Sequence, residues 1–281
     1  MGTSYITSYA AAPAKTVDVG GTTFAYRELG SESGVPVILL NHLGAVLDNW
    51  DPRVVDGLAA QHHVIAFDNR GIGASRGKTP DTVEAMARDA IAFISALGYS
   101  EVDLFGFSLG GFVAQDIVLR RPGLVRRMIL AGTGPAGGVG IDKVTGVTIL
   151  DSVKAVLTGK DPKENLFFTT TANGRAEAKR FVKRLKERRT DRDKSISITA
   201  FRKQLKAIHA WGVAPPADLS SVAQPVLVAN GEHDRMVPSI NSKDLADRLP
   251  NATLRLYADA GHGSIFQYHD EFVAEALAFL K

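Results

Sequence analysis

Short runs of consecutive apolar residues recur along the chain and predict the strands of a buried sheet. Runs without polar alternation are typical of parallel strands that are covered on both faces. They occupy residues 37–40, 63–67, 102–106, 128–131, 225–229 and 252–257. Two further predicted strands, 17–19 and 22–28, flank Gly20-Gly21, a dipeptide that favours a hairpin turn.

Segments with helical periodicity lie between several of these runs. They cover residues 82–97, 109–121, 240–249 and 271–280. Asp81 is a candidate N-cap for the first helix, and Gly98 ends it. Strands that alternate with helices predict an α/β fold, a mostly parallel twisted sheet of about eight strands with helices on both faces.

One stretch of about 70 residues breaks this alternation. Residues 140–212 contain no buried-strand run and are dominated by charged helical patterns. We therefore predict a core domain made of residues 16–139 and 213–281, with residues 140–212 as a helical cap insertion over the strand ends. Residues 1–15 are small and polar, and we expect them to be flexible.

The composition narrows the possible chemistry. The 281 residues are 45% hydrophobic, enough for one large core, and include no cysteine. This excludes disulfides, thiolate metal sites and a cysteine nucleophile. The absence of H-E-x-x-H and of G-x-G-x-x-G at a first Rossmann helix implies no metal and no cofactor.

Charge and targeting signals constrain the partners. The net charge of +3 is small, but residues 175–206 hold thirteen basic and four acidic side chains. A solvated helix face explains this run most simply, and steering of an anionic substrate is the alternative. No nucleic-acid-reading module accompanies the charge. With no apolar run of about 18–20 residues and no signal-like N-terminus, we expect a cytoplasmic protein that binds a small molecule, not nucleic acid or membrane, and that can form a homo-oligomer.

The most informative motif is Gly106-Phe107-Ser108-Leu109-Gly110-Gly111, which follows a predicted strand and precedes a predicted helix. A G-x-S-x-G sequence in this context predicts a sharp turn that projects the serine hydroxyl above the sheet. Side chains at the flanking glycines would collide in such a turn. Ser108 is therefore the candidate nucleophile.

A serine nucleophile needs a base, and the base needs an orienting carboxylate. His262 follows the last predicted strand, and Asp234 follows the strand before it. Carboxyl ends of parallel strands open onto one rim of a sheet, so both side chains are expected near Ser108. Glu232 is the rival for the acid position.

Together these motifs resemble the α/β-hydrolase superfamily over nearly the whole chain. The nucleophile motif, Gly231-Glu232-His233-Asp234 and Gly261-His262 match its three catalytic segments, and residues 67–75 match its D-x-R-G-x-G-x-S turn. The family's acid lies three residues after the glycine, which favours Asp234 over Glu232. The resemblance implies that Asp68 and Arg70 hold the turn together.

The resemblance also implies an oxyanion hole and a pocket. Asn41-His42-Leu43 aligns with the family's His-Gly-x, so the Leu43 and Leu109 amides would bind the oxyanion, with Gly44 as the alternative to Leu43. The Asn-x-Leu-Gly form is similar to that of the enol-lactonase branch, and the haloperoxidase or perhydrolase-like branch is also similar. His42, Phe107 and Trp211 are candidate pocket residues, and His209 lies near the same end of the insertion.

The function that this resemblance implies is that of a serine esterase or lactonase, a hydrolase that works through an acyl-enzyme. The same triad would support a cofactor-free perhydrolase or haloperoxidase, or a carbon–carbon bond hydrolase. A small-molecule receptor with little or no turnover is the alternative outside the enzymes.

Overall fold

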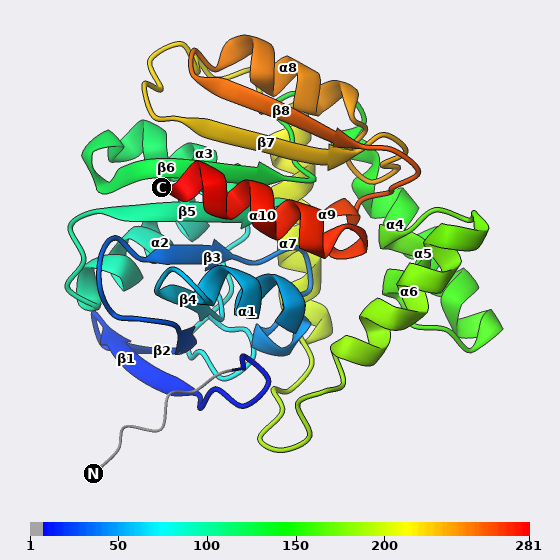
Figure 1. Cartoon of the computed structure of the whole chain (residues 1–281), viewed down its shortest axis with the longest axis horizontal. Coiled ribbons are helices and arrows are strands. Elements are labelled where there is room, and N and C mark those ends of the chain that lie inside the picture. The colour runs from blue at the N-terminus through cyan, green and yellow to red at the C-terminus, as the bar shows by residue number, and fades with distance from the viewer. Residues whose placement is uncertain (1–7) are drawn as a thin grey trace.

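The computed structural model of the chain describes residues 8–281 and is built around one eight-stranded sheet (Figure 1). The strand order is β1-β2-β4-β3-β5-β6-β7-β8. Strand β2 pairs antiparallel with both β1 and β4, and all the other neighbours are parallel. The predicted fold class is confirmed. The strands are β1 (Lys15–Val19), β2 (Thr22–Leu29), β3 (Val37–Leu40), β4 (Val64–Phe67), β5 (Val102–Phe107), β6 (Val125–Ala131), β7 (Val226–Gly231) and β8 (Ala252–Tyr257).

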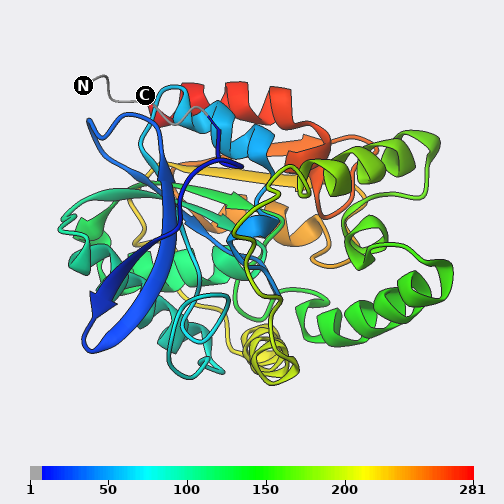
Figure 2. The same ribbon diagram turned by 90° about the horizontal axis from the view of Figure 1, so that it is seen from below.

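Helices cover both faces of this sheet (Figures 1 and 2). The apolar strand residues alternate between two hydrophobic layers: Ile38 and Leu40 face one layer, whereas Val37 and Leu39 face the other. Strands buried on both sides need no polar alternation, which explains their continuous apolar sequences. The α-helices are α1 (Pro52–Ala59), α2 (Val83–Ala96), α3 (Leu109–Arg120), α4 (Val144–Thr158), α5 (Pro162–Phe167), α6 (Ala172–Arg184), α7 (Ile198–Val213), α8 (Ile240–Arg248), α9 (Ser264–Gln267) and α10 (His269–Leu280).

The segment predicted as an insertion lies between β6 and β7 and contains α4, α5, α6 and α7. Figures 1 and 2 show α4, α5 and α6 projecting together from one end of the sheet. Between α6 and α7 the chain returns to the core as an extended segment. Helices α4, α5 and α6, called the cap below, lie at the end of the sheet that carries the Ser108 turn.

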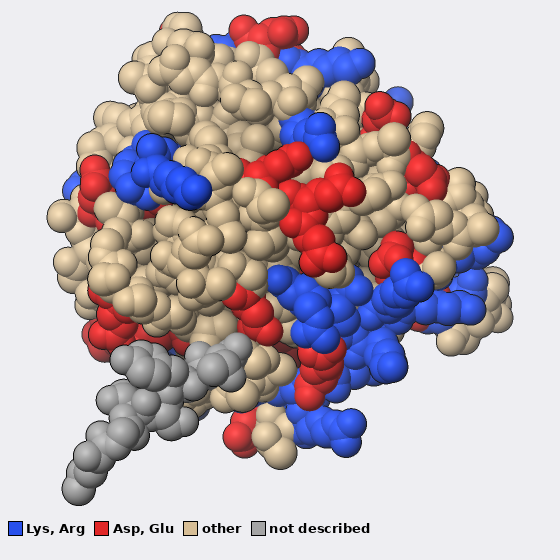
Figure 3. Space-filling model, in the orientation of Figure 1, with Lys and Arg blue, Asp and Glu red and all other residues tan. Residues whose placement is uncertain are grey.

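Buried ion pairs fasten this returning segment to the core. Arg184 donates two hydrogen bonds to Asp51 Oδ2, 2.9 Å from Nε and 2.7 Å from Nη2, and neither side chain is more than one-tenth exposed. Arg27 pairs at 2.7 Å with Asp48 and at 2.8 Å with Asp193 of the segment. Figure 3 shows a large group of Lys and Arg side chains in the region of α6. The prediction of a solvated basic face is thus wrong for Arg184 and Arg188, which are buried.

The start of the described chain is also packed against the core. The predicted flexible stretch covers residues 1–15, of which 1–7 lie outside the described residues. Tyr9 is 2% exposed and donates its hydroxyl to the Leu47 carbonyl at 3.0 Å. Arg188 donates to the carbonyl oxygens of Ala10 and Ala12, at 3.1 and 2.8 Å. These residues close the outer side of the buried ion pairs, an arrangement that their small, polar sequence did not indicate.

Among the helices of residues 8–281, none combines the length and the apolar character that a bilayer crossing needs.

Candidate active site

The turn between β5 and α3 holds Ser108 in a strained conformation. Its φ and ψ are 57° and −117°, outside the regions that L-residues ordinarily occupy. A Cβ at Gly106 would lie 2.4 Å from the Gly110 carbonyl oxygen, and one at Gly110 would lie 1.9 Å from that of Leu40. Both positions therefore require glycine, and the motif is sterically tied to this turn.

Hydrogen bonds on both sides fix the strained residue. The Ser108 N–H donates to the Ala131 carbonyl at 2.9 Å. Its carbonyl accepts from Gly111 N at 2.8 Å and from Thr133 Oγ1 at 2.9 Å. Strain of this kind persists where the surroundings determine the backbone, and it is typical of functional sites.

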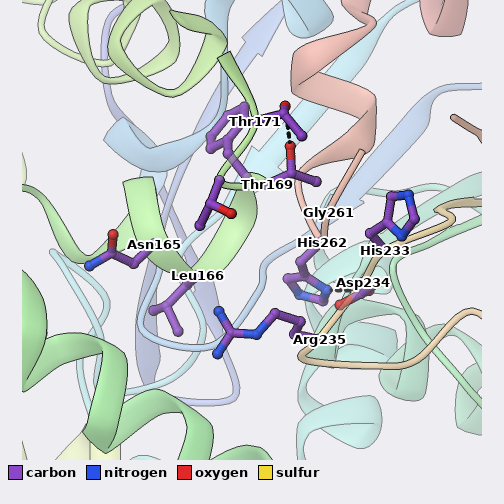
Figure 4. A pocket seen from close by; sticks show the side chains of 11 residues that line it. Asn165, Leu166, Thr169, Thr171, His233, Asp234, Arg235, Gly261 and His262 are labelled. Carbon is purple, nitrogen blue, oxygen red and sulfur yellow. Dashed lines mark hydrogen bonds and ion pairs between the residues drawn. The ribbon is translucent and has the colours of Figure 1, made fainter. Parts of the chain in front are cut away.

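His262 and Asp234 form the second part of the site. His262 Nδ1 donates to Asp234 Oδ2 at 2.7 Å, and both side chains are essentially buried. Asp234 Oδ1 accepts from the Met236 and Val237 amides, at 2.7 and 3.0 Å. The carboxylate is thus held from its own loop, and the imidazole is held in the tautomer that leaves Nε2 free to accept a proton. Figure 4 shows this pair.

The other acidic residues near His262 do not contact its imidazole. Glu232, the rival for the acid position, is exposed, whereas Asp234 contacts the imidazole. Asp259 accepts hydrogen bonds from Thr169, Thr171 and Asn173 and so joins the loop after β8 to the cap. Its pKa is lowered by these three hydrogen bonds, although burial acts in the opposite direction as the largest single cause. The geometry agrees with the preference for Asp234 over Glu232.

The loop after β3 brings Leu43 to the site. Asn41 anchors this loop, because its Nδ2 donates to the Phe67 carbonyl at 2.8 Å and its Oδ1 accepts from Trp50 Nε1 at 2.5 Å. The Gly44 amide is already used, since it donates to Gln204 Oε1 of α7 at 2.8 Å. This favours Leu43 over Gly44 as an oxyanion donor. Leu109 is the first residue of α3, where helix amides have no intrahelical acceptor.

His42 is a second imidazole at the site, and it is electrically neutral. Burial is the main cause that lowers its pKa to about 3, and the nearby charge of Lys163 contributes. Its Nδ1 donates to the Leu43 carbonyl at 2.9 Å. Its ring packs edge-on against Phe107 and Phe167, with centroids 5.4 and 5.2 Å away. His42 therefore shapes the loop and the cavity without competing with His262 as a base.

A cavity of about 270 Å³ lies between the core and the cap. Ser108 and His262 both border it, so the structure brings the predicted nucleophile and base to one space. A wider recess of about 540 Å³ lies beside it, bordered by His262 and by cap residues (Figure 4). The residues around the smaller cavity are His42, Leu43, Gly44, Ser108, Thr148, Ser152, Pro162, Lys163, Leu166, Phe167, Ile196, Phe201, Met236 and His262.

Two candidate pocket residues lie outside these cavity walls. Phe107 is fully buried behind the site, with its ring 5.0 Å from that of His262, and so supports the imidazole. Trp211 stacks on Phe112 at 5.3 Å and belongs to the hydrophobic core. His209 is exposed, with Nδ1 3.2 Å from the Asp142 carbonyl. The cap residues that border the cavity, such as Lys163 and Leu166, carry no motif that sequence reasoning could use.

The Asp68 turn supports the site from outside. Asp68 accepts from the Leu47 and Ala74 amides, at 3.0 and 3.1 Å, and so ties two loops together. Burial, reinforced by the negative charge of Asp193, raises the pKa of Asp68 to about 7. Arg70 pairs with Asp89 at 2.8 Å rather than with Asp68. Asp68 thus holds the turn as expected, whereas the expected ion pair within the turn is wrong, because Arg70 joins the turn to α2.

Comparisons with known proteins identify the family. Residues 35–267 match the model of the alpha/beta hydrolase fold family, and the chain belongs to that family. A solved alpha/beta hydrolase fold protein from Chitinophaga pinensis is 39% identical, covers 97% of this chain and 98% of its own, and superposes with a TM-score of 0.92.

Two curated relatives of the same identity carry different activities in their names. The protein named "Putative carbamate hydrolase RutD" from Agrobacterium fabrum is 27% identical over 89% of this chain and 95% of its own length. The non-heme chloroperoxidase of Streptomyces lividans is 27% identical over 93% of this chain and 97% of its own. The chain is thus an enzyme of the α/β hydrolase fold, and these names alone do not define its substrate.

Proposed function

We propose that this protein is a serine hydrolase that cleaves a carboxylic ester or a lactone through an acyl-enzyme. The observation that carries the proposal is the buried Asp234–His262 pair at 2.7 Å, whose imidazole borders the same cavity as the strained Ser108. A carboxylate-oriented imidazole beside a serine on a strand–helix turn is an arrangement suited to acyl transfer.

The mechanism follows from these positions. Ser108 Oγ attacks the substrate carbonyl carbon while His262 Nε2 takes the hydroxyl proton, and Asp234 stabilises the imidazolium that forms. The Leu43 and Leu109 amides donate to the oxyanion, and each such donor contributes about 3–4 kcal/mol. Collapse breaks the ester bond, and the leaving oxygen takes the proton from His262. In a lactone this oxygen stays attached to the acyl group.

Deacylation uses the same groups. Water loses a proton to His262 Nε2 and attacks the acyl carbon. The carboxylic acid leaves when Ser108 Oγ recovers that proton. His42 does not compete with His262 for these protons, because a pKa of about 3 makes its imidazole a much weaker base than an ordinary histidine.

The test combines covalent labelling with turnover. We expect a fluorophosphonate probe to label the peptide that contains Ser108, and short p-nitrophenyl esters to be hydrolysed. Ser108→Ala should fold normally and lose both properties. Asp234→Asn should lower kcat by several orders of magnitude, because the imidazole adopts the wrong tautomer. Glu232→Gln is the matched control and should remain active. Appreciable hydrolysis by Ser108→Ala would refute the covalent route.

Perhydrolysis is the second candidate, and the similarity to the non-heme chloroperoxidase favours it. Hydrogen peroxide would replace water as the nucleophile on the acyl-enzyme, losing a proton to His262 and releasing a peracid. Peroxide-dependent bromination in an acetate buffer tests this activity. A bromination rate that exceeds the ester hydrolysis rate would favour perhydrolysis as the main activity.

A further inference from the structure

One charged side chain borders the small cavity beside Ser108. Among the described residues around this cavity, Lys163 is the only lysine, arginine, aspartate or glutamate. Apolar side chains such as Phe167, Phe201 and Met236 dominate the rest of the wall. A cation at the edge of a mostly apolar space marks the place where a ligand of opposite charge gains the most.

The surroundings of Lys163 leave its ammonium group available. Lys163 lies in the first turn of the cap helix α5, and its side chain is 24% exposed. Lys163 forms an ion pair with Asp161, but Nζ and Oδ1 are 3.7 Å apart, beyond hydrogen-bonding distance. Asp161 Oδ1 instead accepts from the Lys163 amide at 2.9 Å and caps the helix. The ammonium therefore retains donors for a ligand.

The positive charge of Lys163 acts on a residue that borders the cavity. After burial, it is one of the causes that lower the pKa of His42. His42, Ser108 and Lys163 all border this space, so a molecule bound at Ser108 shares the cavity with the ammonium. A negative group on the substrate could therefore pair with the ammonium while the carbonyl lies at Ser108.

Arg235, the other cation near the site, is already paired. Its Nη1 lies 3.3 Å from Asp151 Oδ2, its side chain is 61% exposed, and it borders the wider recess. Apart from the buried Arg184, the basic side chains of α6 lie on the outside of the cap (Figure 3). Lys163 is therefore the cation that can reach a molecule bound at Ser108.

We propose that Lys163 binds a free carboxylate of the substrate, so that the preferred substrates are small esters or lactones with a second, ionised carboxyl group. This inference rests on the proposed function. The cavity volume of about 270 Å³ lies below the range of about 300–1,000 Å³ typical of drug-sized ligands, which favours a short acyl chain. One ammonium group suits a carboxylate better than a phosphate, which needs more donors and more positive charge.

The first experiment compares two esters of the same shape. Monomethyl succinate carries the carboxylate, and methyl 4-methylpentanoate has a neutral isopropyl group in its place. Release of acid is followed in a pH-stat at low ionic strength. We expect kcat/KM to favour monomethyl succinate at least tenfold, since a hydrogen bond to a charged group contributes about ten- to a hundredfold.

Variants assign the preference to Lys163. Lys163→Met should reduce the ratio of the two kcat/KM values by about ten- to a hundredfold, and Lys163→Arg should retain most of it. Lys160→Met is the matched control, because Lys160 is exposed and lies outside the cavity wall. It should leave the ratio unchanged. An equal rate for both esters in the wild type, or an equal loss of both in Lys163→Met, would overturn the inference.

A binding measurement separates this inference from the proposed function. Calorimetry with monomethyl succinate is carried out on Ser108→Ala and on Ser108→Ala combined with Lys163→Met. Binding that requires Lys163, without hydrolysis by the wild type, supports the carboxylate site and refutes the serine hydrolase. Ser108-dependent hydrolysis without a carboxylate preference has the opposite meaning: the enzyme proposal stands and the Lys163 inference fails.

Discussion

Because α3 approaches β3 closely at Gly110, we can predict how much Gly110→Ala would lower the stability and the activity. In Gly110→Ala the new Cβ would lie 1.9 Å from the Leu40 carbonyl oxygen, whereas real Cβ contacts essentially never fall below 3.0 Å. The start of α3 must therefore move by about an ångström. Neither partner can yield cheaply, because Leu40 belongs to a central strand and Gly110 follows Ser108 in the turn.

The magnitude follows from two opposing effects. Overpacking costs about 1–3 kcal/mol, and a backbone–backbone clash lies at the upper end of that range. Alanine recovers up to about 1 kcal/mol through its helix propensity. We expect a net loss of about 2 kcal/mol and, at about 2–4 °C per kcal/mol, a Tm lower by about 4–8 °C. Displacement of Ser108 and the Leu109 amide by about 1 Å should lower kcat/KM about 100-fold.

Gly146 provides the matched control. It lies in α4, has a negative φ, and a Cβ there would meet nothing within 4 Å. Gly146→Ala should raise the stability by about 0.5–1 kcal/mol and leave ester hydrolysis unchanged. Thermal unfolding and ester kinetics measure both variants. A Gly110→Ala protein with wild-type Tm and activity would refute the steric argument.

Three further predictions concern buried charge. Arg184→Met leaves Asp51 buried and unpaired, so we expect it to destabilise the protein by about 3–5 kcal/mol in denaturant unfolding. Arg53→Met removes an exposed ion pair and should cost about 0–1 kcal/mol. Equal losses in the two variants would contradict this reasoning. Folding raises the pKa of Asp68 to about 7, whereas in the unfolded state this carboxyl group loses its proton near pH 4. Between these two pH values the folded state holds the extra proton, so the free energy of unfolding falls as the pH rises. Unfolding of the wild type and of Asp68→Asn should therefore diverge by up to about 1.4 kcal/mol per pH unit in that interval, and parallel curves would exclude the effect. His42→Asn should keep the wild-type pKa in the rising limb of kcat/KM against pH, because His42, with a pKa of about 3, is neutral throughout; a shift of more than one unit would assign the limb to His42.

The α/β architecture was predictable because its information is local. Runs such as Val37-Ile38-Leu39-Leu40 are apolar on both faces, and only strands within a covered parallel sheet bury both. The turn at Ser108 was equally predictable, since the steric demand of a strand-to-helix turn leaves glycine at Gly106 and Gly110. The topology then places Asp234 and His262 at the same edge of the sheet as Ser108, because the carboxyl ends of parallel strands share one edge.

Contacts between distant segments were decided only in three dimensions. Helix α1 was missed although its signals are local: Asp51 caps it, Pro52 begins it, and Val54, Val55 and Leu58 form its buried face. The basic run gave no sign that Arg184 would be buried against Asp51, because charge alone does not reveal which partner lies 133 residues away. Trp211 looked like a pocket residue, but its packing on Phe112 follows from how α7 crosses α3.

The sequence by itself therefore determined the order of the strands, the main helices between them, the strained serine and the residues able to act with it. These features depend on neighbours in the chain or on one rule of sheet topology. Tertiary structure decided the burial of Arg184 against Asp51, the engagement of Gly44 by Gln204 and the exposure of Lys163 to the cavity. Those depend on distances between loops and the cap, which the packing of the whole chain sets and no local pattern encodes.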